Sequence, residues 1–141
     1  MDPATASAVP LQGEGAVPAP ASENPLTVSV LICTSGRGAS AVETIQSILR
    51  STGPFCELLV IDQSADDRTE KALRSFLTDT RLRYIRTATR GKGIALNIGL
   101  EAAQGEVLAI TDDDCTVDAD WPRGLVEVFE RYPQVAVVYG T

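Results

Sequence analysis

Histidine is absent from this chain of 141 residues, and its absence removes several kinds of chemistry. Neither a Ser-His-Asp nor a Cys-His catalytic arrangement can form within a chain that has no imidazole. A zinc site is disfavoured as well, because histidine is a usual zinc ligand and the three cysteines lack metal-binding spacing. Acid–base or metal chemistry here must therefore come from carboxylates, lysine, tyrosine or a thiol.

Positive charge and long apolar runs are also scarce. The chain has 12 Lys plus Arg against 19 Asp plus Glu, a formal charge of -7, which argues against binding to a nucleic-acid polymer or an anionic membrane. The longest apolar stretches have the length of a strand and fall short of the ~20 residues of a membrane span. The N-terminus lacks the basic region and apolar core of a secretory signal. We therefore predict a cytoplasmic chain without a membrane span.

Cysteine is limited to Cys33, Cys56 and Cys115, an odd number. In a cytoplasmic protein such residues are expected to be reduced thiols. Free cysteine most often behaves as a small buried hydrophobe. We predict that role for all three.

The length allows one domain of ordinary size. Residues 1–26 are rich in Ala, Pro, Gly and Ser without an apolar period, and this composition predicts a disordered tail. Residues 27–141 alternate apolar runs with amphipathic segments, the pattern of βαβ units and a mainly parallel sheet with helices on both faces. The expected strands are 28–33, 58–61, 82–86, 107–110 and 135–139. The expected helices begin near residues 40, 64, 93 and 120. At the first of these, Ser40 and Glu43 form a capping box.

Three consecutive aspartates, Asp112 to Asp114, follow the apolar run 107–110. Alternate side chains of an extended chain point the same way, so Asp112 and Asp114 can converge on one hard cation. The alternative is a solvated turn that caps the next helix, since turns favour aspartate. In parallel α/β sheets, ligands bind beyond the carboxyl ends of the strands, and the triplet lies at such an end.

Other polar residues follow the remaining strands. Thr34 to Arg37 supply a hydroxyl, a glycine and a cation, and Asp62 offers an acceptor for a base N–H or a ribose hydroxyl. All the charged residues from Arg81 to Lys92 are basic, a local excess that suits an anion. Because Lys92 leads into a helix N-terminus, where free N–H groups favour phosphate, we expect a diphosphate there.

Together these segments resemble the nucleotide-binding half of a family 2 glycosyltransferase of the GT-A fold. The matching stretches are VSVLICTSGR, ELLVIDQSADDRT and RGKGIALNIGLEAAQGEVLAITDDDC. The resemblance implies inverting transfer of a sugar from a nucleotide-diphosphate donor, assisted by Mg²⁺ or Mn²⁺. It implies that Asp114 binds the metal, that Asp62 binds the base, and that Asp112 and Asp113 hold ribose or sugar hydroxyls. The donor site it implies comprises Thr34, Arg37, Asp62, Lys92, Asn97, Asp112 and Asp113.

The sequence departs from the family pattern in three places. The family's catalytic base is an Asp or Glu far downstream of the triplet, a position that would lie beyond Thr141. We therefore predict a domain that is incomplete at its C-terminus and a donor-binding fragment with little or no turnover. Leu96 replaces a frequent Arg, and Gln63 replaces a frequent acid after Asp62, so the identity of the nucleotide and the acceptor stays open.

Two alternatives come from other classes of protein. Residues 112–116 also satisfy the Asp-x-Asp-x-Thr pattern of a haloacid-dehalogenase-like, Mg²⁺-dependent phosphatase, with Asp112 as nucleophile and Asp114 as acid–base group. That motif normally opens its domain, however, whereas three expected strands precede it here. The other alternative is a catalytically silent nucleotide-binding fragment.

Overall fold

The computed structural model describes residues 24–139. Most of the expected tail, 1–23, lies outside the described residues. No helix in the described range is long and apolar enough to cross a bilayer.

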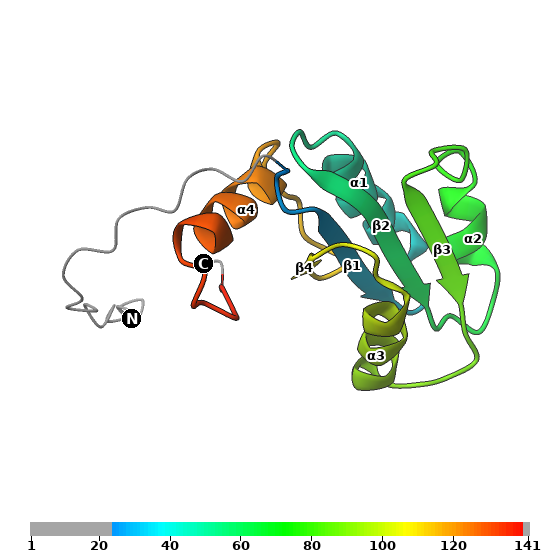
Figure 1. The fold of residues 1–141 in the computed structure, drawn as a ribbon. Coiled ribbons are helices and arrows are strands. Elements are labelled where there is room, and N and C mark those ends of the chain that lie inside the picture. Colours follow the sequence, from blue (N-terminus) through cyan, green and yellow to red (C-terminus); the bar gives the residue numbers. More distant parts are fainter. Residues whose placement is uncertain (1–23, 140–141) are drawn as a thin grey trace, which may run out of the picture.

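The core is a sheet of four parallel strands in the order β3-β2-β1-β4 (Figure 1). The chain adds β2 and β3 on one side of β1 and then returns to place β4 on the other. This reversal creates a switch point between β1 and β4, where open α/β sheets bind their ligands. The strands are β1 (Val28–Thr34), β2 (Phe55–Asp62), β3 (Leu82–Arg86) and β4 (Val107–Ile110).

Helices cover both faces of the sheet, as predicted for strands that are apolar throughout. The helices are α1 (Gly38–Leu49), α2 (Arg68–Leu73), α3 (Lys92–Ala102) and α4 (Trp121–Arg131). On one face α3 packs over Leu31, Leu59 and Ile61. Gly99 of α3 lies so close to the Leu31 side chain that a Cβ would clash with it. The opposite face is covered by α1, α2 and α4 over a second apolar cluster.

The predicted strand at 135–139 is wrong. Within the described residues this segment has no strand structure, and Val137 and Tyr139 are 60% and 89% exposed. The run begins with a turn in which the Val135 N–H donates to Tyr132 O. A groove lined by Val137 and Ile110 separates it from β4, so no backbone ladder forms. The apolar composition suggested a strand, but a strand also needs a partner at hydrogen-bonding distance.

The capping box predicted at Ser40 is also wrong, because α1 begins at Gly38 and has no side-chain cap. Gly38 packs closely against Thr69: a Cβ added to Gly38 would lie 2.9 Å from the Thr69 Cα. Similarly, α2 begins at Arg68 rather than near Ser64, because Ser64 is bound to Asp62.

Candidate functional site

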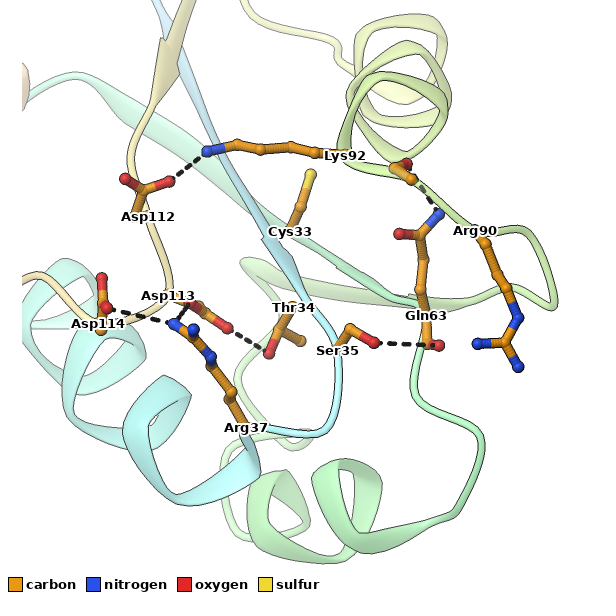
Figure 2. A pocket seen from close by; sticks show the side chains of 11 residues that line it. Cys33, Thr34, Ser35, Arg37, Gln63, Arg90, Lys92, Asp112, Asp113 and Asp114 are labelled. Atoms are coloured by element: carbon orange, nitrogen blue, oxygen red, sulfur yellow. Dashed lines mark hydrogen bonds and ion pairs between the residues drawn. The ribbon is translucent and has the colours of Figure 1, made fainter.

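A polar cleft of about 580 Å³ opens at the carboxyl ends of β1 and β4, at the switch point of the sheet (Figure 2). The three aspartates line one side with Arg37 beside them, and Lys92 and Arg90 come from the other side. Its lining comprises Cys33, Thr34, Ser35, Arg37, Gln63, Arg90, Gly91, Lys92, Asp112, Asp113 and Asp114. The cleft therefore unites the loop after β1, the start of α3 and the acidic triplet.

The three aspartates point in two directions. Asp113 is buried and accepts a hydrogen bond of 2.6 Å from the Thr34 hydroxyl. Asp112 and Asp114 are exposed, and one oxygen of each lies with Cys115 Sγ in a group whose atoms are all within 4.8 Å of one another. The alternation predicted for the triplet is thus present, and the exposed carboxylates fit a divalent cation because hard oxygen ligands suit Mg²⁺ and Mn²⁺.

Two basic residues pair with this acidic rim, Lys92 from across the cleft and Arg37 from beside it. The Lys92 ammonium forms an ion pair with Asp112, and Arg37 Nη1 lies 3.3 Å from Asp114 Oδ2. The hydrogen bond with Asp112, reinforced by its charge, raises the pKa of Lys92, so this lysine stays cationic. Lys92 is the first residue of α3, and Gly91 before it has a φ of 103°. Glycine tolerates this conformation, which turns the chain into the helix beside the acidic rim.

Asp62, which the family resemblance implies binds the base, does not line the cleft. It is fully buried; its Oδ1 accepts the Ser64 N–H at 2.8 Å, and its Oδ2 accepts the Tyr84 hydroxyl. Burial, and then the hydrogen bond to Asp62, raise the pKa of Tyr84. Alternation along β2 explains the placement, because Leu58, Val60 and Asp62 share the face away from α3.

Gln63 is the residue that the sequence interpretation missed. It lines the cleft, and its Nε2 donates to Thr89 Oγ1 at 3.0 Å and to Gly91 O at 3.1 Å. The same alternation along β2 would have placed it on the α3 face, two positions after Ile61. The side-chain amide is therefore held in a defined orientation at the edge of the cleft.

Asn97 also does not line the cleft, and its side chain is exposed on α3. Five residues separate it from Lys92, which corresponds to about 140° around a helix. The two side chains consequently face different directions, and only Lys92 reaches the acidic rim.

The cysteines differ from the prediction that all three are buried. They are free thiols, but Cys56 and Cys115 are exposed, and only Cys33 is partly buried. Cys33 lines the cleft, and burial raises the pKa of its thiol. Cys115 stands in the loop after the triplet, and Cys56 is the second residue of β2.

Residues 29–141 match the family described as Glycosyl transferase family 2. The glucosyl-dolichyl phosphate glucuronosyltransferase of Haloferax volcanii is 31% identical over 120 residues, which are 82% of this chain and 38% of that protein. The poly-beta-1,6-N-acetyl-D-glucosamine synthase of Staphylococcus epidermidis is 26% identical over 114 residues, 80% of this chain and 28% of that protein. The chain thus spans roughly a third of the length of these relatives.

Solved structures show the same fold. The mannosyltransferase PcManGT of Pyrobaculum calidifontis, solved with GDP-Man and Mn²⁺, aligns with a TM-score of 0.65 and 26% identity over 77% of this chain and 33% of that one. TarS of S. aureus aligns with a TM-score of 0.68 and 20% identity over 77% of this chain and 33% of that one. The predicted GT-A type of sheet is confirmed. With the family match covering the cleft and all of the sheet except Val28, the chain belongs to glycosyl transferase family 2.

Proposed function

We propose that the cleft binds a nucleoside-diphosphate sugar together with a divalent cation, Mg²⁺ or Mn²⁺, for sugar transfer with inversion. The observation that carries this proposal is the convergence of Asp112 and Asp114 opposite Lys92 and Arg37 in one cleft. Carboxylates can hold the cation, and the basic groups can hold the diphosphate that shares it. The related mannosyltransferase binds GDP-Man and Mn²⁺, which supports the same donor class here.

Asp114 and Asp112 are the residues proposed to hold the cation, which supplies charge neutralisation for the departing diphosphate. Lys92 and Arg37 act on the same negative charge, and this charge grows as the sugar leaves, so they favour the transition state over the bound donor. Asp113 orients its neighbours: it accepts the Thr34 hydroxyl and lies 3.6 Å from Arg37 Nη1. A sugar or ribose hydroxyl is the proposed ligand of Asp112 and Asp113.

The direct test is calorimetric titration of the chain with UDP, GDP and dTDP, each with and without Mn²⁺. We expect at least one of these nucleotides to bind, and to bind more tightly when Mn²⁺ is present, because a cation held by the carboxylates would attract the diphosphate. Absence of binding to all three, with the chain folded and the metal present, would contradict the donor role.

Gln63 is proposed to contact the nucleobase in place of Asp62. Because its Nε2 is occupied by Thr89 and Gly91, the amide presents its Oε1 as an acceptor. An acceptor pairs with the ring N–H of uracil, thymine or guanine, whereas cytosine offers a lone pair at the equivalent ring nitrogen. The site is therefore expected to reject a base that leaves Oε1 without a donor.

We predict that the chain binds UDP about tenfold or more tightly than CDP, since an unmade buried hydrogen bond costs about 1–3 kcal/mol. Gln63→Leu should remove most of this preference by weakening UDP binding. Calorimetry with both nucleotides measures the ratio, and Gln104→Leu, a change at an exposed side chain, is the matched control. Equal discrimination by wild type and Gln63→Leu would exclude this role for Gln63.

The carboxylate that activates the acceptor is proposed to come from outside these 141 residues, as the family resemblance implies. Glu127 and Glu130 lie on α4, and neither lines the cleft. The isolated chain is accordingly proposed to bind the donor without turnover. No observation favours the dehalogenase-like phosphatase, and the acceptor sugar, lipid or protein is left open.

A further inference from the structure

A second polar cavity of about 320 Å³ adjoins the cleft, between the start of α1 and the loop after the acidic triplet. Asp114 lines both cavities and forms part of the wall between them. Cys115 lines the smaller cavity beside it, and Thr44 lines it from α1. Asp114 is therefore accessible from two sides, and the Cys115 thiol lies on the second side.

The hydroxyl of Thr44 indicates that this cavity takes a ligand. Thr44 is 1% exposed, and its Oγ1 has no hydrogen-bond partner anywhere in the described part of the chain. Buried hydroxyls nearly always have a partner, and an orphan commonly marks a water or ion that belongs at the site. A water bound to an ion at the Asp114 wall would supply the partner that Thr44 lacks.

The thiol of Cys115 has the placement of a metal ligand. Its Sγ lies 3.8 Å from Asp114 Oδ1, and it belongs with oxygens of Asp112 and Asp114 to the group spanning at most 4.8 Å. Ligands on opposite sides of one ion, at metal–sulfur and metal–oxygen distances of about 2.3 and 2.1 Å, are about 4.4 Å apart. Small side-chain rotations are enough to bring all three atoms within bonding distance of one ion. The Cys115 side chain is exposed and has room to rotate.

We propose that Cys115 ligates the same ion as Asp112 and Asp114 and gives the site a preference for softer ions over Mg²⁺. This inference rests on the proposed function, because it concerns the cation of the donor site. On binding, the thiol loses its proton to solvent and the resulting thiolate coordinates the metal. Thiolate is a soft ligand that favours zinc-like ions, whereas Mg²⁺ takes oxygen ligands. Of the two ions proposed for the donor site, Mn²⁺ is closer to zinc in this respect than Mg²⁺, so this ligand set should favour Mn²⁺ over Mg²⁺.

The experiment is a titration of the full chain with Cd²⁺ in the absence of nucleotide, followed by ultraviolet absorption. A thiolate bound to Cd²⁺ produces a charge-transfer band that carboxylates do not give. We expect the band in wild type and its loss in Cys115→Ser, with Cd²⁺ affinity falling about 10- to 100-fold. Mg²⁺ affinity should change little in the same variant, because the carboxylates are intact.

Cys33→Ser and Cys56→Ser are the matched controls and should keep the band. A band that survives Cys115→Ser, or no band in wild type, overturns the proposal. The outcome is separable from that of the donor role. A cysteine-dependent band without nucleotide binding would support the thiol ligand and contradict the donor role. Metal-dependent UDP binding without a band would support the donor role and contradict the thiol ligand.

Discussion

Asp114→Asn is expected to abolish metal-dependent binding of nucleoside diphosphates to this chain. The substitution keeps the size of the side chain but removes the charge of one of two exposed carboxylates that converge beside the cleft. A neutral amide is a weak ligand for a hard divalent ion. Loss of a residue that only orients a metal ligand can lower metal affinity ~100-fold, so loss of a ligand itself should lower it at least as much. Titration of Mn²⁺ by electron paramagnetic resonance and of UDP by calorimetry measures both losses.

The control for this substitution is Asp118→Asn, an exposed aspartate in the same loop that does not line the cleft. It should bind Mn²⁺ and nucleotide as wild type does. The remaining nucleotide affinity of Asp114→Asn should equal that of wild type measured without metal, because Lys92 and Arg37 are unchanged. If Asp114→Asn retained a full Mn²⁺ response, the ion would have to bind elsewhere.

Glu57→Ala is expected to destabilise the fold by about 2–3 kcal/mol, less than the ~3–5 kcal/mol of a fully buried ion pair because Arg83 is 37% exposed. Glu57 is 4% exposed and faces α3, where it accepts hydrogen bonds from the Ser29 hydroxyl and the Gln104 N–H, both at 2.6 Å, and from Arg83. One carboxylate therefore ties three strands to the end of α3. Chemical denaturation measures the change, and Glu101→Ala, at an exposed position of α3, should cost far less.

The contribution of Glu57 should also depend on pH. Burial alone raises the pKa of this carboxyl, but hydrogen bonds from Ser29, Arg83 and Gln104 outweigh it and leave the pKa below its ordinary value of 4.5. Since the folded state holds the proton less tightly than the unfolded state, the stabilisation is complete above the ordinary pKa and is lost as the pH falls through the lowered one. The stability difference between wild type and Glu57→Gln should shrink over that acidic range and stay constant near neutrality.

The sequence predicted the sheet well because its strands are buried on both faces. Apolar runs such as 58–61 and 107–110 can only be satisfied in the interior, so their composition locates them. The run 135–139 has the same composition, but its state depends on whether β4 offers it a hydrogen-bonded edge, and one segment cannot specify its partner. Composition therefore locates strands that are buried on both faces, but it does not locate strands reliably at the edge of the fold.

The site was predictable in outline and not in its assignments. The rule that ligands bind beyond the carboxyl ends of parallel strands placed Thr34, Lys92 and the acidic triplet in one site, because those ends lie at the same edge of the sheet. The placement of Asp62 outside the cleft and of Gln63 inside it depends on the face of β2 that each occupies, and the alternation that decides this was not applied to them. The contact between Thr34 and Asp113 joins residues 79 positions apart, and it needs the knowledge that β4 lies beside β1.

The ion pairs of Lys92 with Asp112 and of Arg37 with Asp114 have a consequence for how the cleft is loaded. A divalent ion that arrives there competes with ammonium and guanidinium groups tethered to the same scaffold. These pairs are largely exposed and are worth about 1 kcal/mol or less each, so the exchange is inexpensive. The displaced groups are then at hand for the diphosphate. Binding of the cation and the diphosphate therefore exchanges the counter-ions of the charged side chains, and little unpaired charge accumulates during the exchange.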